Sequence, residues 1–206
     1  VGANGTIIRT ANGGANWFNI SFFSTTANDL SSVFFINENT GWMGSSSDTV
    51  FYTTNSGSSW TPQIWFVSNV NKIYFANSTT GWILTTPKLY RTTNAGSNWE
   101  LINSQMGNDM YFYNSNFGWK TLYGGGSSTL YKTINGGSSW TPMYSTSDFR
   151  VIYSFAFVNE NTGWAAGYRE HILKTTNGGL NWVQQRFMDN GTGFFSMDFI
   201  NENTGW

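Results

Sequence analysis

The sequence predicts an all-β protein, a β-propeller of five four-stranded blades whose last blade is completed by both termini. The motif T-x-N-x-G-x-x-W occurs five times, a Gly-Trp pair alternates with it, and the segments between them have the composition of short strands. Successive motif tryptophans are 43, 39, 41 and 42 residues apart, a period typical of propeller blades. We call these motifs boxes; they span residues 10–17, 53–60, 92–99, 133–140 and 175–182.

The second repeat shows the expected order of strands. Residues 33–36 form a β-branched and aromatic run, and the turn 37–41 follows it. A second strand is predicted at 42–45, a third at 50–53 and a fourth at 60–64, with turn-forming residues between them. Because no segment has a sustained 3.6-residue apolar stripe, we expect almost no helix.

The box residues suit a tight turn that ends on a buried tryptophan. The Asn side chain can accept hydrogen bonds from backbone N–H groups two or three residues further on, and the Gly tolerates positive φ. Burial of one indole contributes roughly 4–6 kcal/mol. We therefore predict that ten tryptophans are scaffold: Trp17, Trp60, Trp99, Trp140 and Trp182 in the boxes, and Trp42, Trp82, Trp119, Trp164 and Trp206 in the Gly-Trp pairs.

The two ends of the chain together supply one further period. Residues 183–206 and 1–17 add up to 41 residues, so residues 1–206 are predicted to be a single domain of five repeats of about 41 residues. The chain begins at Val1 rather than Met. A closed five-bladed ring is the favoured interpretation, and a segment of a longer repeat array fits the same sequence.

Composition excludes several classes of function. The net charge is −1 with 10% charged residues, which argues against non-specific binding to nucleic acid. No apolar run approaches ~18 residues, so no transmembrane segment is predicted. The absence of cysteine excludes disulfide and thiolate chemistry. A surface rich in Ser, Thr, Asn and Gly favours a secreted or cell-surface, extracytoplasmic bacterial protein.

The boxes resemble the Asp-box, or bacterial neuraminidase repeat, with Asn in place of Asp. The segments 161–164 (Asn-Thr-Gly-Trp) and 175–182 look most like the repeats of the photosystem II assembly factor family of plants and cyanobacteria. The resemblance covers the whole chain and implies a propeller. Similar repeats occur in sialidases, other glycosidases and sorting receptors, so it does not define a function. That family resembles a seven-bladed ring with an arginine-rich surface, whereas this chain has five periods and five arginines.

Residues that recur in every repeat are predicted to be structural. Glu38, Glu160 and Glu202 each lie in N-E-N-T-G-W, and a catalytic carboxylate is not placed three times, so they are interpreted as solvated turn residues. The residue before the box Thr is interpreted as a polar strand edge; it is Arg9, Arg91, Lys132 or Lys174 in four repeats.

Residues that break the repeat are the candidate binding residues. The N-E-N-T-G turn and the box turn should lie on one face of the ring, and the loops that vary between repeats on the other, where function usually lies. Trp65, outside the repeat pattern, either stacks on a ligand or caps a blade edge. The variable loops are alternatively plain connectors. The predicted ligand-binding residues are Trp65, Tyr123, Tyr144, Asp148, Arg150, Tyr168, Arg169, Glu170, His171, Arg186 and Asp189.

Enzyme chemistry has few candidate groups. Glycoside hydrolysis needs two carboxylates about 5–9.5 Å apart, and sequence spacing does not pair the five available on the predicted variable face. These are Asp148, Glu170, Asp189, Asp29 and Asp109. The only unrepeated arginines, Arg150, Arg169 and Arg186, would suit a sialidase-like site. A single histidine cannot form a His-rich metal site, and G-x-S-x-G is absent. No metal or cofactor is predicted.

The sequence thus favours a non-catalytic, secreted or cell-surface binding or scaffold module that recognises a protein or glycan through its variable-loop face. A glycosidase or sialidase-like hydrolase is the first alternative. A structural unit of an extracellular array or fibre, or part of a parent polypeptide, is the second.

Overall fold

Two compact units make up the chain, residues 1–101 and residues 102–206. The structure is a computed structural model that describes residues 1–20, 29–47, 49–65, 69–103, 107, 109–146, 150–188 and 191–206, with Ile64 and Trp65 described by their backbone alone. Within the described residues the only helical element is a 3-10 turn, η1 (Ala3–Gly5). No described helix is both long and apolar enough to span a bilayer.

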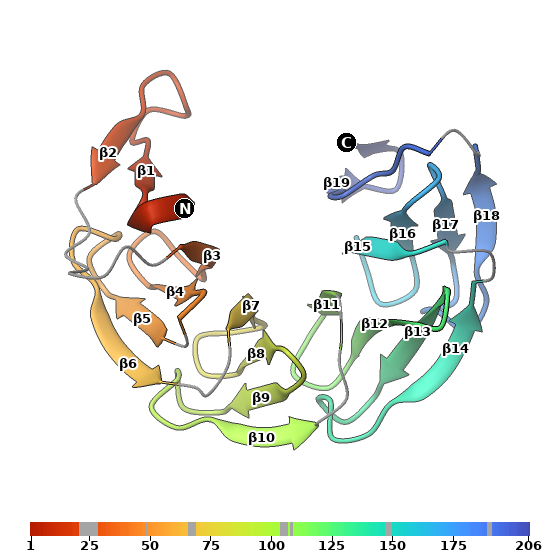
Figure 1. Ribbon diagram of the computed structural model, residues 1–206, viewed down its shortest axis with the longest axis horizontal. Helices are drawn as coiled ribbons and strands as arrows, with labels where there is room; N and C mark the ends of the chain where they lie inside the picture. Colours follow the sequence, from red (N-terminus) through yellow and green to blue (C-terminus); the bar gives the residue numbers. More distant parts are fainter. Residues whose placement is uncertain are drawn as a thin grey trace. The chain divides into compact units, whose positions relative to one another are not determined.

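The first unit contains one two-stranded sheet and two four-stranded sheets, in each of which consecutive strands lie side by side (Figure 1). The two-stranded sheet is formed by β1 (Ile7–Arg9) and β2 (Phe18–Ile20). The four-stranded sheets are β3 (Leu30–Phe35), β4 (Gly41–Ser45), β5 (Thr49–Thr53) and β6 (Thr61–Trp65), then β7 (Val70–Phe75), β8 (Gly81–Thr85), β9 (Leu89–Thr92) and β10 (Glu100–Asn103), which runs past the unit boundary.

The second unit repeats this organisation and ends on two short strands. One four-stranded sheet consists of β11 (Asp109–Phe112), β12 (Gly118–Gly124), β13 (Ser127–Thr133) and β14 (Thr141–Ser145). The other consists of β15 (Ile152–Phe157), β16 (Gly163–Gly167), β17 (Ile172–Thr175) and β18 (Val183–Arg186). The last sheet pairs β19 (Phe199–Asn201) with β20 (Thr204–Gly205).

The predicted four-stranded blade is confirmed, but the predicted count of five is not. Within the described residues the structure has four such blades, and each end segment forms a two-stranded sheet. By their position in the repeat, β19 and β20 are a first and a second strand, whereas β1 and β2 are a third and a fourth. A blade requires all four strands to pair, and these two pairs come from opposite ends of the chain.

A phenylalanine in the first strand of each sheet that carries a Gly-Trp pair explains the Gly of that pair. A Cβ added at Gly118 would lie 2.4 Å from Cδ1 of Phe112, and one added at Gly163 would lie 2.3 Å from Cδ1 of Phe157. Only glycine lets the ring lie flat on the neighbouring strand. The same contact recurs at Gly41, Gly81 and Gly205.

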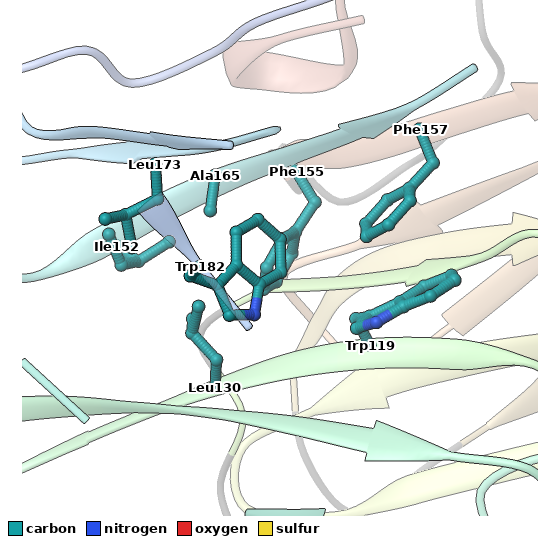
Figure 2. Packing of buried hydrophobic residues seen from close by; sticks show 8 residues of the cluster. All are labelled: Trp119, Leu130, Ile152, Phe155, Phe157, Ala165, Leu173 and Trp182. Atoms are coloured by element: carbon teal, nitrogen blue, oxygen red, sulfur yellow. The ribbon is translucent and has the colours of Figure 1, made fainter. Parts of the chain in front are cut away.

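In the second unit, the Gly-Trp tryptophan stacks on the phenylalanine of the next sheet. Trp119 and Phe157 have ring centroids 3.7 Å apart, and the box residue Trp182 meets Phe157 edge-on at 6.0 Å (Figure 2). Lys132, at the position interpreted as a strand edge, lies with its Nζ 5.6 Å from the centroid of Trp119. Phe157 and Trp119 are 7% and 1% exposed, so this contact forms part of the core of the second unit.

Two of the ten predicted core tryptophans are exposed, and for them the prediction was wrong. Trp17 is 58% exposed and Trp206 is 76% exposed. The sheet that carries Trp17 has no first strand to supply a phenylalanine, and Trp206 ends a two-stranded sheet. The other eight are buried or half-buried: Trp42, Trp60, Trp82, Trp99, Trp119, Trp140, Trp164 and Trp182.

The box turn is held by its Thr and Asn side chains. Asn94 Oδ1 accepts hydrogen bonds from Thr92 Oγ1 and from the N–H of Asn98, both at 2.9 Å, so the backbone donor lies four residues on rather than the expected two or three. Gly96, with φ of 86°, donates its N–H to Thr92 Oγ1 at 3.0 Å. The N–H of Ala95 donates to the Thr79 carbonyl at 2.9 Å, which places both turns of the repeat on one face as predicted.

The turn glutamates also link successive repeats. Glu202 Oε1 accepts hydrogen bonds from Asn159 Nδ2 at 3.1 Å and Thr162 Oγ1 at 3.3 Å. Glu160 accepts one from Asn114 Nδ2 at 3.4 Å. These glutamates are exposed, as predicted, and they connect the turns of neighbouring sheets.

Candidate functional site

Part of the predicted binding surface gathers at one end of the β15–β18 sheet, away from its box turn. The loop between β16 and β17 carries four candidates, and the ends of the neighbouring strands bring two more. We call this group the β16–β17 loop site; its predicted members are Arg150, Tyr168, Arg169, Glu170, His171 and Arg186.

The loop is a strained turn pinned by backbone hydrogen bonds. Arg169 and Glu170 have φ values of 60° and 49°, a left-handed conformation that is uncommon for residues other than glycine. Tyr168 forms a β-bridge with Gly193, and the Arg169 N–H donates to the Thr192 carbonyl at 2.6 Å. The surrounding chain thus holds the backbone of the turn in place.

Glu170 and Arg186 form an ion pair within the site. Arg186 Nε donates to Glu170 Oε2 at 2.9 Å, and its Nη2 donates to the same oxygen. Thr192 Oγ1 donates to the other oxygen, Oε1, at 3.0 Å. The Glu170 side chain is 16% exposed and that of Arg186 is 49% exposed, so the arginine remains open to solvent.

His171 lies beneath this surface and is fully buried. Its ring meets Phe187 edge-on at 6.1 Å, and the Arg150 guanidinium lies 4.1 Å from the centroid of Phe187. Burial and, to a smaller extent, the charge of Arg150 lower the pKa of His171 to about 4, and the nearby Gln184 side chain opposes the shift. Within the described residues neither ring nitrogen has a partner in hydrogen-bond geometry, so His171 is a neutral packing residue at pH 7.

The other predicted residues do not join the β16–β17 loop site, or cannot be placed. Tyr144 packs against the core of the second unit, and Tyr123 lies at the β12–β13 hairpin, 37% exposed. Trp65 lies opposite Thr49 in β6, and its side chain lies outside the described part. Asp148 and Asp189 lie outside the described residues, so the carboxylate pair that a glycosidase would need stays a prediction.

Two aromatic residues of this surface were missed by sequence reasoning. Phe187 lies between Arg150 and His171, and Phe195 stacks on Tyr153 at 5.0 Å while remaining 74% exposed. Neither position is aromatic in every repeat. This departure from the repeat was the signal in the sequence that could have marked both residues as binding candidates. Arginine and aromatic side chains are both enriched at protein–protein interfaces.

Lys120 is a third residue that the sequence pattern did not single out. It follows the Gly-Trp pair of its repeat, a position occupied by Met43, Ile83 and Ala165 in the other blades, and it is 2% exposed. Burial lowers its pKa to about 8. Its Nζ lies 4.9 Å from the ring centroid of Trp140, so an aromatic face partly replaces the lost water.

Four-stranded meander sheets that pack through repeated aromatic residues define an all-β, propeller-type repeat protein. The sequence matches no family model and no curated protein. Among solved structures, it resembles YCF48 bound to D1 peptide, with TM-score 0.56 and 19% identity over 100% of this chain and 84% of that chain. YCF48 from Cyanidioschyzon merolae gives TM-score 0.75 and 16% identity over 97% of this chain and 72% of that chain.

A GH74 enzyme is similar over a smaller share of its length. The GH74 enzyme of Niastella koreensis gives TM-score 0.73 and 17% identity, covering 94% of this chain but 38% of that chain. At these identities the likeness shows the propeller fold alone. The structural neighbours therefore include both a peptide-bound protein and an enzyme.

Proposed function

We propose that this chain is a non-catalytic binding or scaffold module that recognises a protein segment through the β16–β17 loop site and its aromatic surroundings. The observation that carries the proposal is the combination of three features near the pinned β16–β17 loop. They are the solvent-facing Arg186, the Arg150–Phe187 stack and the exposed Phe195. Arginine and aromatic side chains are enriched where proteins bind one another. The similarity to a YCF48 structure with bound D1 peptide supports a peptide partner over a glycan.

The finer features of the fold belong to the same proposal. The β19–β20 and β1–β2 pairs are complementary halves of the repeat, so we propose that together they make a fifth blade. The Asp-box relationship and a secreted or cell-surface location in a bacterium remain parts of the proposal, supported by the repeat motif and the composition.

Selection of peptides tests the binding role. A phage-displayed peptide library is panned against the full chain, and the selected peptides are measured by fluorescence anisotropy. We expect affinity to fall at least about tenfold in Arg150→Ala/Phe187→Ala, because a central aromatic–arginine pair contributes ~1.4 kcal/mol or more. Phe18→Ala, a change at an exposed ring in the first unit, should leave binding unchanged. Peptides that bind the double variant equally well would refute this site.

The glycosidase alternative has its own measurement. The similarity to GH74 enzymes suggests xyloglucan as the substrate to try. Release of reducing sugar by the wild-type chain, lost in Glu170→Gln, would favour the hydrolase over the binding module. We expect no release, because Glu170 is held by Arg186 and Thr192 rather than presented as a free acid.

A further inference from the structure

Met188 is the most exposed methionine among the residues that the structure describes. Its side chain is 46% exposed, whereas Met43 and Met110 are buried and Met143 and Met197 are half-buried. A thioether that reaches solvent is open to oxidation, which converts it into a polar, chiral sulfoxide. Within the described part of the chain, Met188 is therefore the methionine that an oxidant meets first.

The backbone of Met188 is tied to the β16–β17 loop. The Met188 N–H donates to the Arg169 carbonyl at 3.0 Å, and the Arg169 N–H donates to the Thr192 carbonyl at 2.6 Å. These two hydrogen bonds join three segments of the chain. They fix the backbone position from which the Met188 side chain extends.

The sulfur of Met188 contacts the guanidinium of Arg186. Arg186 Nη2 donates to Met188 Sδ at 2.9 Å, and the same nitrogen donates to Glu170 Oε2. Nη2 carries two hydrogens, so one serves the carboxylate and the other serves the thioether. Arg186 Nε also donates to Glu170 Oε2 at 2.9 Å, and Thr192 Oγ1 donates to Glu170 Oε1 at 3.0 Å. Groups other than Met188 thus hold the guanidinium against the sulfur.

This contact makes the two lone pairs of the sulfur unequal. Oxidation at one lone pair or at the other gives different sulfoxide epimers, because the product is chiral at sulfur. The guanidinium covers the lone pair that accepts the Nη2 hydrogen, and it leaves the other lone pair unengaged on a side chain that is 46% exposed. An oxidant from solvent therefore reacts at one lone pair in preference to the other.

The reaction requires only a peroxide from solvent. The unengaged lone pair of Sδ attacks one oxygen of hydrogen peroxide, the O–O bond breaks and an S–O bond forms. The sulfur loses two electrons and the peroxide gains them. Proton transfer through solvent then leaves one sulfoxide and one water for each peroxide consumed.

We propose that Met188 is a reversible oxidation site at which a peroxide forms one sulfoxide epimer in excess, with Arg186 as the positioning residue. The sulfoxide places a polar oxygen where the surface beside the β16–β17 loop site has an apolar thioether. Each class of methionine sulfoxide reductase acts on one epimer, so one reductase restores most of the thioether. The proposal concerns the chemistry of one side chain and does not rest on peptide binding.

Peptide mapping by mass spectrometry tests the site after a pulse of dilute hydrogen peroxide on the full chain. We expect Met188 to be oxidised at least about tenfold faster than Met43 and Met110, because burial keeps the oxidant away from those two sulfurs. The digested peptides are then treated with a reductase specific for one epimer or for the other. We expect at least about a fourfold excess of one Met188 epimer from the folded chain, and near-equal amounts from the chain unfolded in urea before oxidation.

Two arginine variants assign the selectivity to its cause. Arg186→Ala removes the donor to Met188 Sδ, so the ratio of the two epimers should fall toward one. Arg169→Ala is the matched control in the same loop, since the Arg169 guanidinium lies 6.0 Å from the ring centroid of Tyr168, and it should keep the excess. Tryptophan emission spectra of the variants should match that of wild type, which confirms that both are folded.

Any of four results would overturn the proposal. They are equal epimers from the folded wild type, the same excess from the unfolded chain, an excess that persists in Arg186→Ala, and oxidation of Met188 no faster than that of Met43. Loss of the excess in Arg169→Ala would also refute Arg186 as the positioning residue. The peptide selection described above measures affinity rather than oxidation, so the two proposals fail separately.

Discussion

The indole of Trp42 lies on the ring of Phe75 with centroids 3.5 Å and planes 14° apart. Trp42 belongs to β4 and Phe75 to β7, so the stack joins two consecutive sheets that share no strand pairing. The Nε1 of Trp42 also donates to a box carbonyl of the next sheet. These two blades therefore stabilise each other, as neighbours do in other repeat proteins.

Removal of the shared phenylalanine should destabilise the chain strongly. Phe75→Ala loses the stack with Trp42 and the edge contact with Trp99 at a fully buried position, and we expect a loss of about 3–5 kcal/mol of unfolding free energy. Phe18→Ala, at a 61% exposed ring, should change stability by less than about 0.5 kcal/mol. Urea denaturation measures both. Equal effects would show that the stack does not couple the sheets.

The glycine of the Gly-Trp pair should not tolerate even one methyl group. A Cβ at position 118 would lie 2.4 Å from Phe112, so Gly118→Ala must displace that ring and should cost about 1–3 kcal/mol. Gly124→Ala is the matched control, because a Cβ there meets no atom within 4 Å. Thermal unfolding of the two variants should differ clearly, and indistinguishable melting temperatures would contradict the close contact.

The box asparagine should be replaceable by aspartate but not by alanine. Asn94 Oδ1 accepts two hydrogen bonds, and a carboxylate oxygen can accept both. We expect Asn94→Ala to lose about 1–3 kcal/mol and Asn94→Asp less than about 1 kcal/mol in denaturant titrations. A greater loss for Asp than for Ala would show that the Asn acts through its amide group instead.

Acid should destabilise the second unit through His171. Its folded pKa of about 4 lies below the unfolded value of 6.5, so the unfolded state binds the proton first. The stabilising contribution of the neutral ring is complete above pH 6.5 and is lost as the pH falls toward 4, by at most roughly 3 kcal/mol. In His171→Leu, the free energy of unfolding should depend less on pH between pH 6.5 and pH 4. A wild-type curve with the same slope as the variant would refute a buried neutral ring.

Lys120 should be a site where replacement stabilises the chain. Its folded pKa of about 8 is below 10.5, so the ionised form is penalised at neutral pH and stability rises as the pH passes from 8 toward 10.5. Lys120→Met introduces the residue that the second repeat has at the equivalent position, Met43. We expect the free energy of unfolding to rise by roughly 1–3 kcal/mol at pH 7 and by less near pH 10. A destabilised Lys120→Met at pH 7 would indicate that contacts such as that with Trp140 outweigh the desolvation.

Much of the fold could be predicted from the repeat alone. Local hydrogen bonding and residue spacing determine the strand order and place both turns of the repeat on one face. They also explain why the box turn needs Asn94 and Gly96. The candidate site was predicted less well. Sequence spacing marked Glu170 and Arg186 as unrepeated, but their pairing and the role of Phe187 depend on how two loops fold back together.

The sequence by itself determined the four-stranded repeat, because each blade is built from contacts within about 41 residues that recur in every copy. It also indicated which residues are scaffold. Only the tertiary structure decided which copies of a repeated residue are buried: Trp42 is enclosed and Trp206 is exposed, though both follow Thr-Gly. The physical reason is that burial of an indole depends on the phenylalanine of another blade. A repeat motif specifies the side chain, and the neighbouring sheet decides whether that side chain is covered.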